Sequence, residues 1–261
     1  MHTKQPVSSG CALPYDKGIQ GQMKIIPEQD AVKSAAISIA RNIIETDHSD
    51  NFLLNMMRHL IAFGDTLISK TEAIDSNTPI ACSCGCSYCC HMQVKVTPPE
   101  IFLIFAYILK TFNIGEQDRL NKRILSNRLL TEGKTLDERI LLKRETPCIF
   151  LTDHSCDIYK ARPLICHAWH SLNRDGCESA FISEDAHAEI ETAPLRNYVL
   201  SMIREAIKDI CINMNWEYDA YELPSAIFSC FHDENPMKNW LLKHHLFNKD
   251  VYAGNDSEKL S

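Results

Sequence analysis

Several features that mark common classes of protein are scarce in this sequence. The 261 residues carry 27 lysines and arginines against 34 aspartates and glutamates, a formal net charge of −7. This acidic balance gives no electrostatic reason to expect nucleic acid or an anionic membrane as the main partner. The nine glycines form neither a P-loop nor a dinucleotide-binding turn. Serine, histidine and aspartate follow no triad order, and no carboxylate pair indicates acid–base catalysis.

Long apolar runs are missing as well. The longest, from Ile101 to Leu109, is far short of the roughly 20 residues that a membrane-spanning helix needs. The first residues, Met1 to Pro6, lack the apolar segment of a secretory signal. A hydrophobic content of 45% with 23% charged residues is ordinary for a globular protein. We therefore expect a cytoplasmic protein with a substantial core and no membrane contact.

Cysteine, by contrast, is abundant, with twelve in the chain. Five fall between Cys82 and Cys90, and a second set follows about sixty residues later: Cys148, Cys156, Cys166 and Cys177. In a reducing cytoplasm, clustered cysteines indicate metal ligands or redox groups more than disulfides. Adjacent cysteines, such as Cys89 and Cys90, close a disulfide only with strain. We predict that the two sets meet around metal, with disulfides and inert thiols as the alternatives.

Helical periodicity dominates the rest of the chain. Apolar residues recur at helical spacing over about Glu28–Glu45, Asn51–Thr71, Ile101–Phe112, Glu116–Glu145, Ala193–Asn215, Leu223–Phe231 and Met237–Phe247. A Thr97 cap, two prolines and Glu100 open the third of these, and Val94–Val96 reads as a short extended piece. The prediction is a mainly α fold: one irregular helical domain, residues 25–250, whose cysteine-rich metal-binding core at 82–177 is made of loops. Residues 1–24 and 251–261 read as a flexible arm and a frayed tail.

Two segments allow more than one interpretation. In the charged segment from Glu116 to Glu145, Gly133 is a candidate break. Its basic residues favour a solvated helix face over a contact patch. The segment from Pro147 to Cys177 shows little regular structure, and a metal cross-link can stabilise such a stretch.

The cysteine chemistry suits a soft or borderline metal. Four thiolates in a tetrahedron fit zinc or the irons of an Fe–S cluster. The candidate ligands are Cys82, Cys86, Cys89, Cys90, Cys148, Cys156, Cys166 and Cys177. Eight thiols exceed one tetrahedral site, so two metals and one cluster with spare thiols both stay open. Of the others, Cys11 reads as a free thiol, Cys84 has no assignable role, and Cys211 and Cys230 fit buried structural positions on helices.

One short motif resembles an enzyme family. Cys82-x3-Cys86-x-Tyr88-Cys89 is similar to the loop of radical S-adenosylmethionine enzymes, in which three cysteines hold three irons of a [4Fe–4S] cluster. That family's barrel of alternating strands and helices has no counterpart in the sequence pattern. An Fe–S enzyme of this kind, or of a protein-methylating kind, is the alternative function.

A longer, multipart pattern resembles a second family. Its parts are Cys86-Ser87-Tyr88-Cys89-Cys90-His91, Val94-x-Val96-Thr97-Pro98-Pro99-Glu100, Pro147-Cys148-x-Phe150-Leu151 and Cys156-x-Ile158-Tyr159-x-x-Arg162-Pro163-x-x-Cys166. Over roughly residues 82–177 it is similar to the YkgJ-type cysteine-cluster family, a zinc- or iron-chelating CxxCxxCC domain. A related cluster occurs in flagellin lysine methylases. The resemblance implies metal chelation, with zinc, iron or an Fe–S cluster as the cofactor, and no particular reaction.

Residue by residue, the resemblance covers most of the candidate ligands. On the family's cysteines fall Cys86, Cys89, Cys90, Cys148, Cys156 and Cys166, while Cys82 fits a variant with a longer first spacing. His167 stands where the family commonly has arginine, which makes a nitrogen ligand conceivable.

Possible roles can also be given to residues close to the cysteines in the sequence. Arg162 fits either a hydrogen-bond donor to sulfur or a salt bridge with Asp157 or Asp153. His91 and His170 are secondary ligand candidates. Three functions are consistent with these patterns: a metal-binding protein, which we favour, an Fe–S enzyme, and a thiol-based redox or metal sensor. The sequence indicates no particular protein partner.

Overall fold

The computed structural model describes residues 29–74, 79–183, 185 and 188–247. The predicted arm at 1–24, the tail at 251–261 and Cys11 lie outside these ranges. Helices dominate the described residues, and the strands are short, so the prediction of a mainly α fold is confirmed. None of the described helices combines the length and the apolar character needed to cross a membrane.

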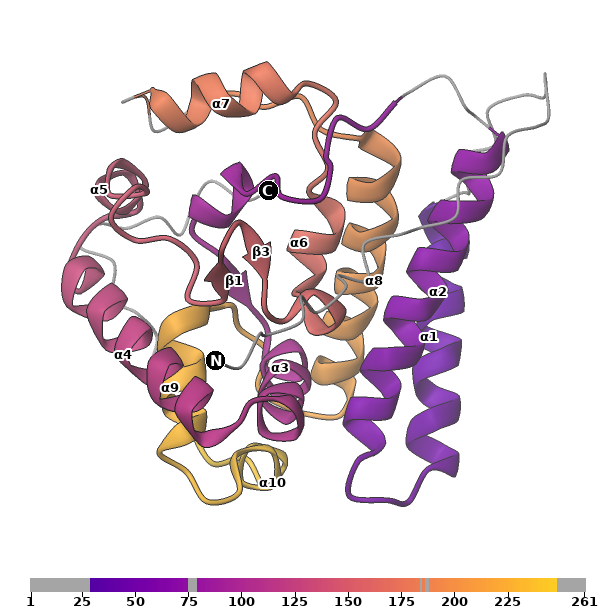
Figure 1. The fold of residues 1–261 in the computed structure, drawn as a ribbon. Helices are drawn as coiled ribbons and strands as arrows, with labels where there is room; N and C mark the ends of the chain where they lie inside the picture. The colour runs from indigo at the N-terminus through magenta and orange to yellow at the C-terminus, as the bar shows by residue number, and fades with distance from the viewer. Residues whose placement is uncertain (1–28, 75–78, 184, 186–187, 248–261) are drawn as a thin grey trace, which may run out of the picture.

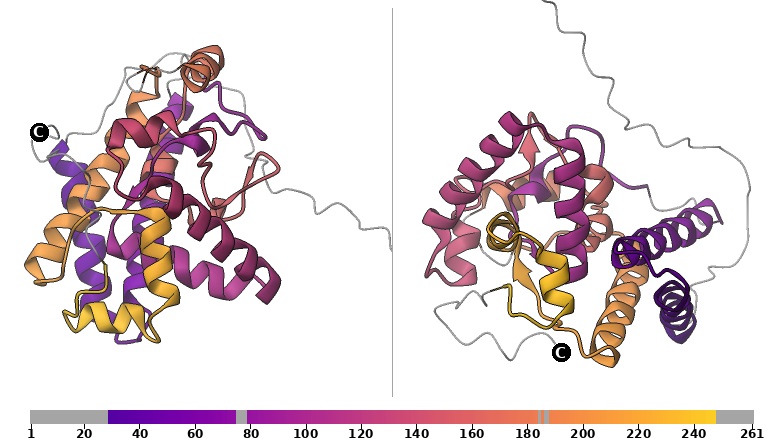
Figure 2. Two further views of the ribbon diagram at one scale, coloured as in Figure 1. Left: turned by 90° about the vertical axis from the view of Figure 1, so that its left-hand side faces the viewer. Right: turned by 90° about the horizontal axis from the view of Figure 1, so that it is seen from below.

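Three long helices pack together on one side of the molecule (Figures 1 and 2). They are α1 (Gln29–Thr46), α2 (Phe52–Ile74) and α8 (Pro194–Asn213). Gly64 permits the close approach of α2 to α8, because a Cβ atom there would come within 2.7 Å of Ile203 Cδ1. The apolar stripes predicted for these helices line the core, where Ala36, Met57 and Ile203 are fully buried.

A second group of helices surrounds α3 (Pro98–Thr111), which contacts both α2 and α9 (Leu223–Phe231). Helix α4 (Ile114–Thr131) packs on α9, and α10 (Pro236–Leu241) lies nearby (Figure 1). Strand β1 (Lys95–Val96) pairs antiparallel with β4 (Tyr221–Glu222), which joins the start of α3 to the start of α9. One continuous apolar core connects both groups of helices.

The structure corrects three local predictions. The segment from Glu116 to Glu145 contains two helices, α4 and α5 (Leu136–Leu141), and Gly133 lies between them with a φ of 71°. The proposed break at Gly133 is thus confirmed. The solvated face is wrong for Arg139 and Lys143, whose exposures are 3% and 4%, because each has polar partners inside the protein.

Two element boundaries also differ from expectation. The helix predicted over Met237–Phe247 ends at Leu241, and Lys243 has a left-handed φ of 65° that no α-helix continues through. The end of the segment expected to be irregular, residues 174–177, belongs to helix α7 (Arg174–Ile182). The Asn173 side chain caps it by accepting a hydrogen bond from the Gly176 N–H at 3.0 Å.

Candidate metal centre

The first cysteine set lies on a loop that enters a short 3-10 helix. Gly85, with a φ of 84°, allows the turn between Cys84 and Cys86. The 3-10 helix η1 (Tyr88–His91) then carries Cys89 and Cys90. Strand β1 and helix α3 follow directly, so the loop is anchored to the core.

Hydrogen bonds join this loop to the second set. The Cys148 N–H donates to the Cys90 carbonyl at 2.7 Å, and the Ala81 N–H donates to the Ser171 carbonyl at 2.9 Å. The Ser171 N–H in turn donates to the Cys82 sulfur at 3.3 Å. Segments about sixty to ninety residues apart are thus held together, and the two cysteine sets meet in space as expected.

A tight hairpin positions Cys148 and Cys156. Strands β2 (Leu151–Thr152) and β3 (Ser155–Cys156) pair across a two-residue turn. Asp153 and His154 have φ values of 47° and 60°, the backbone of a type I′ turn. The Ser87 hydroxyl and His154 Nδ1 lie 3.0 Å apart, which connects the hairpin turn to the first cysteine loop.

One buried carboxylate positions Cys166 and His167. Glu100 accepts hydrogen bonds from the Thr97 N–H and from the Leu164 N–H, both at 2.9 Å. It therefore satisfies the start of α3, as the predicted capping box requires, and also the start of α6 (Leu164–Ala168). A residue recognised as a local cap is thus also a long-range tether.

Helix α7 brings Cys177 to the same region. The Phe181 ring lies 5.7 Å from the Tyr88 ring and 4.7 Å from the His91 ring. The Lys143 ammonium group donates to the Ala180 and Ser183 carbonyls, both at 2.7 Å, which satisfies the C-terminal end of the helix. Cys177 is buried there.

Five of the predicted ligands share one electrostatic neighbourhood: Cys89, Cys90, Cys148, Cys156 and Cys166. Burial raises the pKa of Cys148 to about 12, and the negative charges of Cys156 and Cys89 add to that rise. Burial also raises the pKa of Cys166 well above its usual value, again with Cys148, Cys89 and Cys156 contributing. Sulfur atoms affect one another in this way only when they are close.

The remaining ligands form a second neighbourhood. Burial raises the pKa of Cys82; the Ser171 N–H opposes the rise, and the charges of Cys86, Cys89 and Cys177 add to it. Cys89 belongs to both groups. A hydrogen bond from Cys90 lowers the pKa of Cys89 to about 7 and raises that of Cys90. The eight predicted ligands therefore divide into two adjoining groups that share Cys89, whereas Cys84 is exposed at the turn.

Arg162 faces the thiols. Its positive charge lowers the pKa of Cys89, Cys156 and Cys166. Its guanidinium carbon lies 4.2 Å from the centre of the Tyr159 ring, an arrangement that stabilises the cation. Asp157 pairs with Arg123 at 3.5 Å. Arg162 Nε is buried and, among the described residues, has no hydrogen-bond partner.

These donors fit a thiolate-binding metal. All eleven cysteines in the described ranges are free thiols, and the orphaned Arg162 N–H is suited to donate to a metal-bound sulfur. No three histidine, cysteine, aspartate or glutamate side chains of the described residues are spaced as the ligands of one ion. The structure therefore brings the thiols into one region beside a cationic side chain.

A family model decides the class of this region. It matches residues 81–190 and is described as "CxxCxxCC: Putative zinc- or iron-chelating domain". Residues 81–190 are similar to this family's domain. The resemblance seen in the sequence is confirmed, as is zinc or iron chelation as the type of function. No curated protein and no solved structure shows significant similarity to the chain.

Some residues of the matched region 81–190 and its surroundings could not be identified from sequence. Asp65 on α2 and Lys143 carry no motif, since their partners lie on distant segments. His154 lies in a segment predicted to have little regular structure, and no motif there indicates its contact with Ser87. Cys211 and Cys230, assigned to structural positions, are fully buried.

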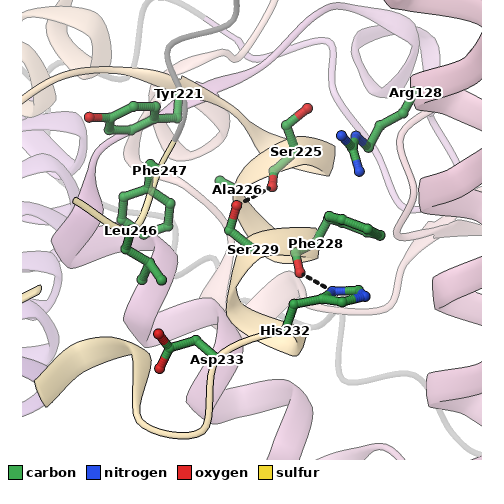
Figure 3. Close-up of a pocket in the computed structure, with 10 residues that line it drawn as sticks. All are labelled: Arg128, Tyr221, Ser225, Ala226, Phe228, Ser229, His232, Asp233, Leu246 and Phe247. Carbon is green, nitrogen blue, oxygen red and sulfur yellow. Dashed lines mark hydrogen bonds between the residues drawn. The ribbon is translucent and has the colours of Figure 1, made fainter. Parts of the chain in front are cut away.

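Two cavities lie outside the thiol groups. One, of about 260 Å³, is bordered by α9, Arg128 and Leu246 (Figure 3). The Ser229 hydroxyl donates to the Ser225 carbonyl, and His232 Nδ1 lies 2.9 Å from the Phe228 carbonyl. Because these polar groups bond within their own helix, the cavity is a packing feature of α9 rather than a second part of the metal centre.

Proposed function

We propose that this protein binds zinc or iron through the thiolates of its two adjoining cysteine groups. The ligands would come from Cys82, Cys86, Cys89, Cys90, Cys148, Cys156, Cys166 and Cys177. The observation that carries the proposal is that hydrogen bonds hold the two cysteine sets together, from the Cys148 N–H to the Cys90 carbonyl and from the Ser171 N–H to the Cys82 sulfur. The effects of the sulfurs on one another's pKa, with Cys89 common to both groups, agree with this arrangement. A shared residue supports two neighbouring ions or one Fe–S cluster more than a single tetrahedral ion.

The metal would have a structural task in this fold. Burying several thiolates is unfavourable unless a cation compensates their charge, and a bound metal supplies most of that compensation. Arg162 adds positive charge and an N–H donor. The loop at 79–92, the hairpin at 151–156 and helices α6 and α7 would then be cross-linked within one helical domain, residues 25–250. A reducing compartment such as the cytoplasm keeps these thiols available.

Anaerobic purification with elemental analysis tests the proposal. We expect zinc or iron to co-purify. Cys89→Ser and Cys156→Ser should each lower the metal content and the solubility together. Cys84→Ser is the matched control, because Cys84 lies in the same loop but is not one of the proposed ligands, and it should leave both unchanged. Thiols that are all free and a protein without zinc or iron would refute metal binding.

The same preparation separates the kinds of centre. A brown protein containing iron and sulfide indicates an Fe–S cluster, and a colourless one with zinc indicates a structural site. A cluster whose EPR signal changes on addition of S-adenosylmethionine would replace the structural proposal with the enzyme alternative. The described residues give that alternative no support from the fold, since they contain helices and two antiparallel strand pairs instead of a βα barrel.

A further inference from the structure

The second cavity, of about 290 Å³, lies between the end of α3, the first half of α4 and the β2–β3 hairpin. Its apolar wall consists of Tyr107, Phe112, Leu120 and Ile149. Leu120 and Ile149 are only 2% and 1% exposed, so the cavity reaches down to the core. An apolar cavity of about 150 Å³ holds a benzene molecule. This cavity therefore has room for an aromatic ring with a short side chain.

Two arginines of α4 line the same cavity. Arg119 and Arg123 are four residues apart, so they lie on one face of the helix. Arg123 Nη1 donates to the Ile149 carbonyl at 3.2 Å and to the Thr152 hydroxyl at 3.0 Å. The same nitrogen lies 3.5 Å from an Asp157 carboxylate oxygen. These contacts all use Nη1, which leaves Nε and Nη2 of Arg123 to donate to a ligand. Arg119 has no hydrogen-bond or ion-pair partner among the described residues.

The two carboxylates at the cavity already accept hydrogen bonds. Glu116 Oε2 accepts from the Asn113 N–H at 2.8 Å, as part of the cap of α4. Asp157 Oδ2 accepts from the Thr152 hydroxyl at 2.8 Å and lies beside Arg123. The charged groups still able to form hydrogen bonds are therefore mainly N–H donors of the two guanidinium groups. Such donors bind a carboxylate in pairs, with matching planar geometry.

We propose that this cavity binds a small carboxylic acid with an apolar body. The body would lie against the apolar wall, and the carboxylate would accept hydrogen bonds from Arg119 and Arg123. Because Arg123 also holds the hairpin through Thr152, the bound acid would stabilise the hairpin. The site goes beyond metal binding and does not depend on it, since none of the eight proposed metal ligands is among the residues that line the cavity.

Isothermal titration calorimetry of the full-length protein with 3-phenylpropionate tests the proposal. We expect saturable binding with a Kd of about 0.1–10 mM, the range for an acid of this size. The alcohol 3-phenylpropanol keeps the ring and lacks the carboxylate, so it should bind about 10–100-fold more weakly. Arg119→Gln should weaken the binding of the acid by a similar factor, about 10–100-fold. Since Arg119 is exposed, this substitution should leave the fold intact.

Arg128→Gln is the matched control. Arg128 lies on the same helix but lines the cavity at α9. Its guanidinium carbon is 4.1 Å from the centre of the Phe228 ring. The substitution removes one positive charge of α4 without changing the proposed site, so the Kd for 3-phenylpropionate should stay the same. An equal loss of affinity in Arg119→Gln and Arg128→Gln would indicate a general effect of charge and would overturn the proposal.

Hydrogen exchange locates the bound acid. Bound 3-phenylpropionate should slow exchange across residues 149–157 and leave α9 unchanged. Slower exchange in α9 alone would place the acid in the other cavity and overturn the proposal. No saturable binding, equal affinity for 3-phenylpropanol, or equal affinity for acetate would also overturn it. A protein that binds the acid but neither zinc nor iron would refute the metal-binding proposal alone, so the two proposals fail separately.

Discussion

Cys211 and Cys230 differ from Cys148 and Cys166 in what surrounds their sulfur atoms. Burial raises the pKa of Cys211 to about 12, the same value that Cys148 reaches. At Cys148, however, neighbouring thiols contribute to the rise, whereas Cys211 is packed in the apolar core on α8. Burial by itself therefore does not distinguish a ligand from a structural thiol. The predicted ligands differ from the structural thiols in having other sulfur atoms and Arg162 nearby.

Removal of the metal should destabilise the cysteine-bearing loops more than the three long helices. A metal present at 1,000 times its Kd stabilises the folded state by about 4 kcal/mol, which corresponds to a fall in Tm of about 8–16 °C for a protein of this size. Hydrogen exchange should show faster opening at 79–92 and 148–177 than in α1, α2 and α8. If hydrogen exchange became faster by the same factor in the loops and in the three long helices, the proposed difference between these two regions would be wrong.

The helical frame should be weakened by a change far from the thiols. Arg139 and Glu222 form a buried ion pair at 2.6 Å, with exposures of 3% and 2%. Glu222→Gln should lower the free energy of unfolding by about 3–5 kcal/mol, because it leaves a buried charge uncompensated. Urea titration of the purified variant measures the loss. The double variant Arg139→Met, Glu222→Leu should recover much of it, and the metal content should stay the same throughout.

The two kinds of buried cysteine should respond differently to serine. Cys211→Ser should cost about 1–3 kcal/mol of stability, since it places an unsatisfied hydroxyl in the apolar core, and metal content should be unchanged. Cys156→Ser should reduce metal content. Urea titration with elemental analysis measures both quantities in each variant. If Cys211→Ser released metal, Cys211 would have to be counted with the ligands.

Alkaline pH should destabilise the metal-free protein. The pKa of Cys211 is raised from an unfolded value of about 8.5 to about 12 in the folded state. A raised folded pKa means that stability is complete below the unfolded value and is lost as pH rises towards the folded value. At pH 10 the loss should be about 2 kcal/mol for this thiol. Urea titrations at pH 7.5 and pH 10 measure it, and Cys211→Ala should lack this part of the dependence.

The smallest expected effect is chemical rather than energetic. With its pKa lowered to about 7 by the hydrogen bond from Cys90, Cys89 should be half thiolate near pH 7 in the metal-free protein. Mass spectrometry of iodoacetamide-labelled peptides should show its alkylation rate rising through that pH. Cys90→Ala should move the rise to higher pH. Metal loading should protect Cys89 and leave exposed Cys84 reactive.

Much of the helical architecture followed from local patterns. The segments from Ala193 to Asn215 and from Leu223 to Phe231 show helical apolar spacing and have proline near the start, and both form the predicted helices within a few residues. The two wrong predictions of helix position also have local causes. Helix α7 carries a weak apolar pattern and is held by Lys143, and the chain after Leu241 turns at Lys243.

The sequence by itself determined the chemistry of this protein, because thiol spacing, the Tyr159–Arg162–Pro163 segment and helical periodicity are properties of neighbouring residues. Only the tertiary structure decided which thiols share a neighbourhood, since that depends on hydrogen bonds such as Cys148 to Cys90 and Ser171 to Cys82. It also decided that Glu100 joins two helix starts and that Asp65 faces His167. Contacts across 58 or more residues, such as Cys148 to Cys90, leave no periodic trace in a sequence, because the packing of separate elements creates them.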